Sequence, residues 1–113
     1  MSPFPVVRIA GKVLPRATLI RVLSVRAPRA ALVRVRCHGR GCPLRAVRRR
    51  SSGRQLRFRQ FQRRLRAGIR LEIFVRRPGT IGKYTRFRIR AGDPPKRIDR
   101  CLFPATQRPK RCP

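Results

Sequence analysis

Acidic residues are the scarcest feature of this 113-residue chain: three Asp and Glu stand against 32 Lys and Arg, a formal charge of +29. General acid–base catalysis by paired carboxylates therefore has few candidates. Glu72 falls in a predicted strand, where it is better suited to pairing with neighbouring arginines than to acting as a base. Asp93 and Asp99 lie in a proline-containing segment, and no serine belongs to a credible catalytic triad. We expect that the protein is not an enzyme.

Long apolar runs are absent as well. No stretch approaches the ~20 apolar residues that span a bilayer, so we expect no membrane span. The opening "MSPFPVVRIAGKVLPR" has no charged region followed by an apolar run of secretory length. Either the chain stays inside the cell or it is a module of a larger secreted protein. The glycines of "GTIG" (79–82) precede a predicted strand rather than a helix, which excludes the phosphate-cradling loops of nucleotide-binding proteins. We expect no cofactor and no small-molecule substrate.

Arginine is what the chain has in excess, since it supplies 28 of the 32 cations. A GC-rich genome raises arginine content by itself, so the bias alone does not show selection for binding. A compact domain with this charge would still gain from contact with any polyanion. Taken alone, the composition favours a nucleic-acid-binding protein.

Most of the chain alternates apolar and charged residues with a period of two, as strands with one buried face do. In "LVRVRC", for example, Val33 and Val35 share one face, and Arg34 and Arg36 share the other. Turn residues divide the chain into short segments. This pattern predicts an all-β fold, a small β-sandwich of immunoglobulin-like architecture with roughly six or seven short strands in a single domain, residues 1–113. The expected strands are 5–11, 17–28, 32–37, 56–59, 70–75 and 84–90.

Three segments depart from simple alternation. The parity of apolar residues switches near Val22 and Leu23, which predicts a bulge or burial on both faces. In residues 59–68 two apolar side chains lie four apart, so one or two helical turns are expected. From about Asp93 to Pro113 the prolines predict a loop that wraps the surface as an irregular tail. The expected core consists of Val33, Val35, Phe58, Leu71, Ile73, Val75, Phe87 and Ile89.

The four cysteines allow three interpretations. A zinc site could draw on Cys37, His38, Cys42, Cys101 and Cys112, but these spacings fit the usual ligand pattern poorly. Redox catalysis prefers a C-x-x-C motif at a helix start, which is missing. The favoured interpretation is structural: "CHGRGC" forms a hairpin turn closed by a Cys37–Cys42 disulfide, and Cys101–Cys112 pins the tail. Two disulfides would place the domain outside the cytosol, at the cell surface or in the extracellular space.

The quoted segments "LSVRAP", "VRVRCHGRGCP", "LRAG", "IFVRRPGTIGKYTRFRIRAGDPP" and "DRCLFP…RCP" together resemble a known pattern. They are similar to an uncharacterised, cysteine-containing β-rich domain of immunoglobulin type in predicted secreted or surface proteins of GC-rich bacteria. The shared features are a C-x-G-x-G-C-P turn, a "PG-x-I-G-K" hairpin and a terminal cysteine pair, over residues 6–113. The resemblance implies disulfides and an extracytoplasmic location, but no function. One departure is "PRAAL" (28–32), where the pattern would have a glycine before the strand.

Binding is the function that the arginines favour. Alternate residues of a strand lie roughly 6.5–7 Å apart on one face, within a Debye length of roughly 8 Å, so such arginines attract a shared polyanion. Aromatic residues for base stacking are few, since Tyr84 alone falls on the cationic parity. We therefore expect a non-catalytic extracytoplasmic structural or adhesion module that docks on anionic polymer. The alternative is a cytoplasmic nucleic-acid-binding or ribosome-associated protein. The candidate binding residues are Arg34, Arg36, Arg57, Arg59, Arg86, Arg88 and Arg90, with Arg45–Arg50 as a second cationic segment.

Overall fold

The computed structural model describes residues 1–104, 106 and 108–113, and in them the chain is all-β. One 3₁₀ turn, η1 (Arg59–Phe61), interrupts the strands. The strands are β1 (Val6–Leu14), β2 (Ala17–Arg26), β3 (Leu32–His38), β4 (Ala46–Arg50), β5 (Leu56–Arg57), β6 (Arg64–Arg66), β7 (Arg70–Arg76), β8 (Gly82–Arg88) and β9 (Lys96–Leu102).

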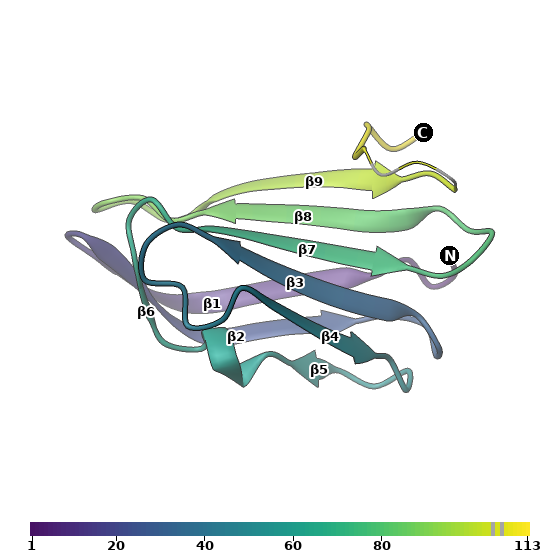
Figure 1. Ribbon diagram of the computed structural model, residues 1–113, viewed down its shortest axis with the longest axis horizontal. Helices are drawn as coiled ribbons and strands as arrows, with labels where there is room; N and C mark the ends of the chain where they lie inside the picture. The colour runs from purple at the N-terminus through teal and green to yellow at the C-terminus, as the bar shows by residue number, and fades with distance from the viewer. Residues whose placement is uncertain (105, 107) are drawn as a thin grey trace.

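The strands form two stacked antiparallel sheets (Figure 1). The five-stranded sheet has the order β4-β3-β7-β8-β9. In the four-stranded sheet, β1 pairs with β2, whose other edge pairs with β5 near one end and with β6 near the other. The smaller sheet is therefore only three strands wide at any level. The predicted β-sandwich is confirmed as a two-sheet architecture, and its principal extents are 42 × 26 × 21 Å.

The interior between the sheets is apolar. All eight expected core residues are at most 1% exposed, which confirms that list. The smaller sheet adds Ile20, Leu23 and Val25 to the same cluster, and Phe61 and Leu65 enter it from η1 and β6. The alternation that identified the strands therefore also identified which parity faces the core.

The predicted irregularity in β2 is present one residue earlier than expected. Ala10 pairs with Val22 and Gly11 pairs with Ile20, so Arg21 is the extra residue of a bulge. The bulge lets Ile20 and Leu23 both face the core although their parity differs. It also leaves Arg21 exposed.

Two expectations about irregular segments were met only in part. Residues 59–68 contain one helical turn, the 3₁₀ turn Arg59–Phe61, but Leu65 lies on strand β6 rather than on a helical face. The segment after Asp93 is not wholly a loop, because Lys96–Leu102 forms the edge strand β9. No proline lies between Pro95 and Pro104, and an edge strand needs hydrogen bonds on one side only, which these residues supply to β8.

The strand number was also underestimated, because β4, β6 and β9 escaped the period-two pattern. Strand β4 carries a single apolar residue that packs on the core, Val47, among arginines. Strand β6 is three residues long. Short and cationic edge strands leave little hydrophobic periodicity to detect.

Two disulfides hold the ends of the five-stranded sheet. Cys37–Cys42 closes the β3–β4 hairpin with a Cα–Cα distance of 5.9 Å, and Gly39 and Gly41 of the turn adopt positive φ angles of 113° and 97°. Cys101–Cys112 ties the terminal segment to β9 with a Cα–Cα distance of 4.9 Å. Both predicted disulfides are confirmed. In the chain-entropy model each loop of this length contributes roughly 2–3 kcal/mol.

Candidate polyanion-binding face

The five-stranded sheet has one face on the core and one face turned away from it. Cross-strand pairing places alternate residues of all five strands on the second face, which we call the outer face. Its cations are Arg48 and Arg50 of β4, Arg34 and Arg36 of β3, Arg70 and Arg76 of β7, Arg86 and Arg88 of β8, and Lys96 and Arg100 of β9.

These cations are close neighbours in two directions. Arg34 pairs directly with Arg48, and Arg70 pairs with Arg88, so like charges face each other across strands about 4.8 Å apart. Partial burial, followed by the charge of Arg34, lowers the pKa of the Arg76 guanidinium. Like-charge crowding of this kind is relieved by a bound polyanion.

Glu72 is the one carboxylate on the outer face, and its partners differ from the prediction. Its two oxygens contact His38 Nε2 at 2.5 Å and accept a hydrogen bond from the Tyr84 hydroxyl at 2.6 Å, rather than binding an arginine directly. Burial raises the pKa of Glu72, but the hydrogen bonds from Tyr84 and His38 and the charges of His38 and Arg70 outweigh it and lower the pKa below its usual value. For Tyr84, burial and then the bond to Glu72 raise the pKa to about 12.

A small apolar cluster interrupts the outer face. Phe74, Tyr84 and Leu102 are buried together, with the Phe74 and Tyr84 rings edge to face at a centroid distance of 5.1 Å. The Arg34 guanidinium lies 4.8 Å from the Phe74 centroid, a cation–π contact that fixes its position. Sequence reasoning missed Phe74. The available signal was an aromatic residue on the charged parity of "RLEIFV", because Tyr84 on the next long strand has the same parity.

Two hollows flank Phe74 on this face. One, of about 190 Å³, is lined by Arg34, Arg48 and Arg76 together with Leu32. The other, of about 360 Å³, lies on the far side of Phe74 among Glu72, Tyr84, Arg86, Ile98, Arg100 and Pro109. The cationic surface therefore contains two arginine-lined depressions, and Phe74 belongs to the lining of both.

The structure brings together four of the seven candidate arginines, Arg34, Arg36, Arg86 and Arg88. The other three lie elsewhere. Arg57 belongs to β5 of the smaller sheet, where its side chain donates to the Gln62 amide oxygen and the Arg21 carbonyl. Arg59 begins η1, and Arg90 follows β8 and donates from Nε to the Pro94 carbonyl at 2.8 Å.

The second cationic segment, Arg45–Arg50, divides between two roles. Arg48 and Arg50 extend the outer face by one strand. Arg49 has the opposite parity, and it donates to the Arg57 carbonyl at 3.0 Å while its guanidinium lies 5.9 Å from the Phe58 ring. Arg49 therefore closes the edge of the sandwich between β4 and β5, so it is structural.

The cysteine pairs are too far apart to share a zinc ion. Cys37 and Cys101 lie on β3 and β9, which β7 and β8 separate, so at least about 14 Å divides them. All four thiols are bonded in disulfides, and His38 points away from its neighbour Cys37 to bind Glu72. Within the described residues no group of three or more His, Cys, Asp or Glu side chains could hold a metal ion. Paired disulfides are typical of an oxidising environment outside the cytosol.

Comparison with known proteins gives no assignment: no protein-family model, no curated protein and no solved structure matches the chain. The resemblance drawn from the sequence motifs stays a prediction. In the part of the chain that the structure describes, no helix is long and apolar enough to cross a membrane.

Proposed function

We propose that the protein is a non-catalytic, extracytoplasmic module of immunoglobulin-like type, part of a larger secreted or surface protein, that docks on anionic polymer through the outer face. The observation that carries this proposal is the set of cations from five adjacent strands on one face, with Glu72 as their only carboxylate. Arginine forks bind phosphate and carboxylate groups in two-point contacts. Spread over several strands, they suit a ligand with repeated anionic groups better than a single small anion.

The alternative is an intracellular nucleic-acid-binding or ribosome-associated protein, which the charge would also suit. Two observations favour the polymer-docking function over it. Phe74 and Tyr84 are only 9% and 5% exposed, so they offer no platform on which bases could stack. Both disulfides would be lost in a reducing cytosol.

The test replaces Arg34, Arg36, Arg86 and Arg88 with Ser and measures binding to heparin, to an anionic cell-wall polymer and to RNA. Each lost contact removes a counterion-release contribution, so we expect affinity to fall at least about tenfold and the salt dependence to flatten. The matched control replaces Arg16, Arg21, Arg63 and Arg64, four exposed arginines outside the outer face, and removes the same charge. Equal loss in both variants would show that net charge, not the outer face, is responsible.

A second measurement separates the two functions. The polymer-docking module should show no strong preference for nucleic acid in competition, and its melting temperature should fall when the disulfides are reduced. A preference for a particular RNA or DNA of about a hundredfold or more, together with a melting temperature unchanged by reductant, would favour the intracellular protein.

A further inference from the structure

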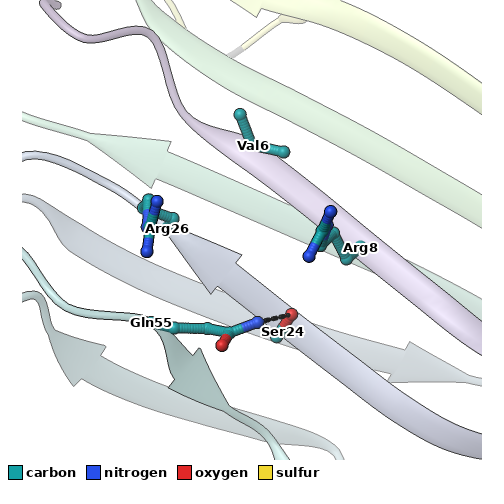
Figure 2. A pocket seen from close by; sticks show the side chains of 5 residues that line it. All are labelled: Val6, Arg8, Ser24, Arg26 and Gln55. Carbon is teal, nitrogen blue, oxygen red and sulfur yellow. Dashed lines mark hydrogen bonds between the residues drawn. The ribbon is translucent and has the colours of Figure 1, made fainter.

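A separate hollow of about 280 Å³ lies on the four-stranded sheet, away from the outer face (Figure 2). Arg8 and Val6 come from β1, Ser24 and Arg26 from β2, and Gln55 from the residue before β5. In Figure 2 the two guanidinium groups rise beside a floor made by the Ser24–Gln55 hydrogen bond.

The hollow forms because a small side chain lies between two long side chains on neighbouring strands. Ser24 pairs with Arg8 on one side and with Arg57 on the other, so a small side chain sits between two long ones. Arg57 is turned aside by its hydrogen bonds to Gln62 and to the Arg21 carbonyl. The hollow therefore lies over this part of the sheet, with Arg8 and Arg26 at its sides and Ser24 buried at its floor.

Ser24 has unused hydrogen-bonding capacity. Its hydroxyl oxygen accepts a bond from Gln55 Nε2 at 2.8 Å, and its side chain is buried, with the residue only 1% exposed. Among the described residues, no acceptor receives the Ser24 hydroxyl hydrogen. Buried polar hydrogens normally have partners, so this one would gain from an anion oxygen that reached the floor of the hollow.

The two arginines also lack counter-charges. Within the described part of the chain, neither Arg8 nor Arg26 takes part in an ion pair, and the acidic residues with ion-pair partners, Glu72 and Asp99, belong to the five-stranded sheet. Two guanidinium groups and a buried hydroxyl thus line one hollow. That set of donors matches an oxyanion with several acceptor oxygens.

We propose that this hollow is a discrete binding site for a phosphate or sulfate group, with Arg8 and Arg26 as the charged clamp and Ser24 as the buried donor that Gln55 orients. The site does not depend on the outer face or on the proposed function. Its volume suits one such group with the first atoms of whatever carries it, rather than a segment of polymer.

The experiment titrates the ¹⁵N-labelled protein with inorganic phosphate and, separately, with inorganic sulfate at about 150 mM salt, where diffuse charge effects are largely screened. We expect saturable shifts at the backbone amides around Ser24 and at the Nε–H signals of Arg8 and Arg26. The anion that saturates the site, or the tighter of the two, identifies whether a phosphate or a sulfate ester is the natural source.

Three variants test the assignment. Arg8→Gln with Arg26→Gln should weaken binding by at least about tenfold, and Ser24→Ala by about tenfold, as expected for loss of a hydrogen bond to a charged group. The control, Arg63→Gln with Arg64→Gln, removes the same charge from exposed positions beyond the hollow and should leave affinity within about twofold. Equal weakening in both arginine pairs, or shifts that never saturate and spread over the outer face, would overturn the proposal. The melting temperature of each variant confirms that it is folded.

Discussion

The two faces of the five-stranded sheet use the same strands for different purposes. On the inner face Val33, Val35 and Ile73 are fully buried against the smaller sheet. The residues that follow Val33 and Val35 in β3, Arg34 and Arg36, lie on the outer face beside cations from the neighbouring strands. In this sheet most of the apolar burial therefore lies on the inner face, and most of the charge lies on the outer face.

The two carboxylates that form ion pairs sharpen the contrast, because each face has one. Asp99, on the inner parity of β9, accepts hydrogen bonds from Arg97 and Thr85 and lies 3.6 Å from Lys83. Burial raises the pKa of Asp99, but the Arg97 and Thr85 hydrogen bonds and the charges of Arg97 and Lys83 together lower it. The carboxylate neutralises cations beside the core.

Glu72, on the outer face, instead holds His38 and Tyr84 and makes no direct contact with an arginine among the described residues. The acid on the inner parity thus supports packing, whereas the acid on the outer face supports the shape of a cationic surface.

The first and largest prediction is that substitutions on the inner face lower the free energy of unfolding much more than substitutions on the outer face. We expect Ile73→Ala to lower the free energy of unfolding by about 2–5 kcal/mol, because it leaves a cavity in a fully buried site. Arg36→Ala, one strand away on the exposed outer parity, should change it by no more than about 0.5 kcal/mol. Urea denaturation followed by circular dichroism measures both. A loss of more than about 1 kcal/mol in Arg36→Ala would assign the outer face a structural role.

The same contrast explains what sequence reasoning could and could not predict. Hydrophobic alternation in 32–37, 70–75 and 84–90 identified three central strands and their buried parity, because burial of one face imposes a period of two. Edge strands such as β4 and β9 have few buried residues and therefore show no clear period of two, so they were missed. The disulfides were predictable from local spacing, since each joins residues close in sequence.

The candidate site was only partly predictable for a related reason. Parity placed Arg34 and Arg36 on one face, but which strands lie side by side is a matter of long-range pairing. Pairing alone separates Arg57, in the smaller sheet, from Arg86 in the larger one. It likewise brings Glu72 from β7 to His38 on β3, a contact that spacing along the chain does not indicate.

A second prediction concerns Tyr84, the sole tyrosine in a chain without tryptophan, so its phenolate absorbance can be followed without interference. In the folded protein the midpoint should lie at about 12, against about 10 when unfolded. Folding raises this pKa, so the stabilising contribution of neutral Tyr84 is complete below pH of about 10 and is lost as the pH rises through about 12. The free energy of unfolding should therefore fall as the pH rises from about 10 to about 12.

Glu72→Gln separates the causes of the raised pKa. The midpoint should fall because the Glu72 charge is gone, yet stay above about 10 because burial, the largest cause, remains. Asp99→Asn makes the same change of charge on the inner parity, one residue from the cross-strand partner of Tyr84, and should leave the midpoint unchanged. Equal shifts in both variants would mean that the two carboxylates act through net charge and that the faces are not electrically distinct.

The smallest expected effect is in the turn that leads into β3, where the sequence departs from the glycine expected before the strand. Ala30 has a φ of 72°, the only positive φ of a non-glycine residue in the described part of the chain. The turn is held by bonds from Ala31 N to the Pro28 carbonyl and from Ala30 N to the Ser51 carbonyl. An L-residue in this region costs roughly 1–2 kcal/mol, whereas glycine adopts it freely.

Ala30→Gly should therefore raise the free energy of unfolding by about 0.5–1 kcal/mol, since the relief of backbone strain exceeds the added freedom of the unfolded chain. Ala30 is exposed, so no packing is lost.

The matched control is Ala46→Gly on the exposed edge strand β4, where the same change should instead lower stability by about 0.5–1 kcal/mol. Urea midpoints at constant slope give both values. Opposite signs would show that Ala30 is strained in the left-handed region in solution. Equal losses would mean that Ala30 relaxes out of the left-handed region in solution.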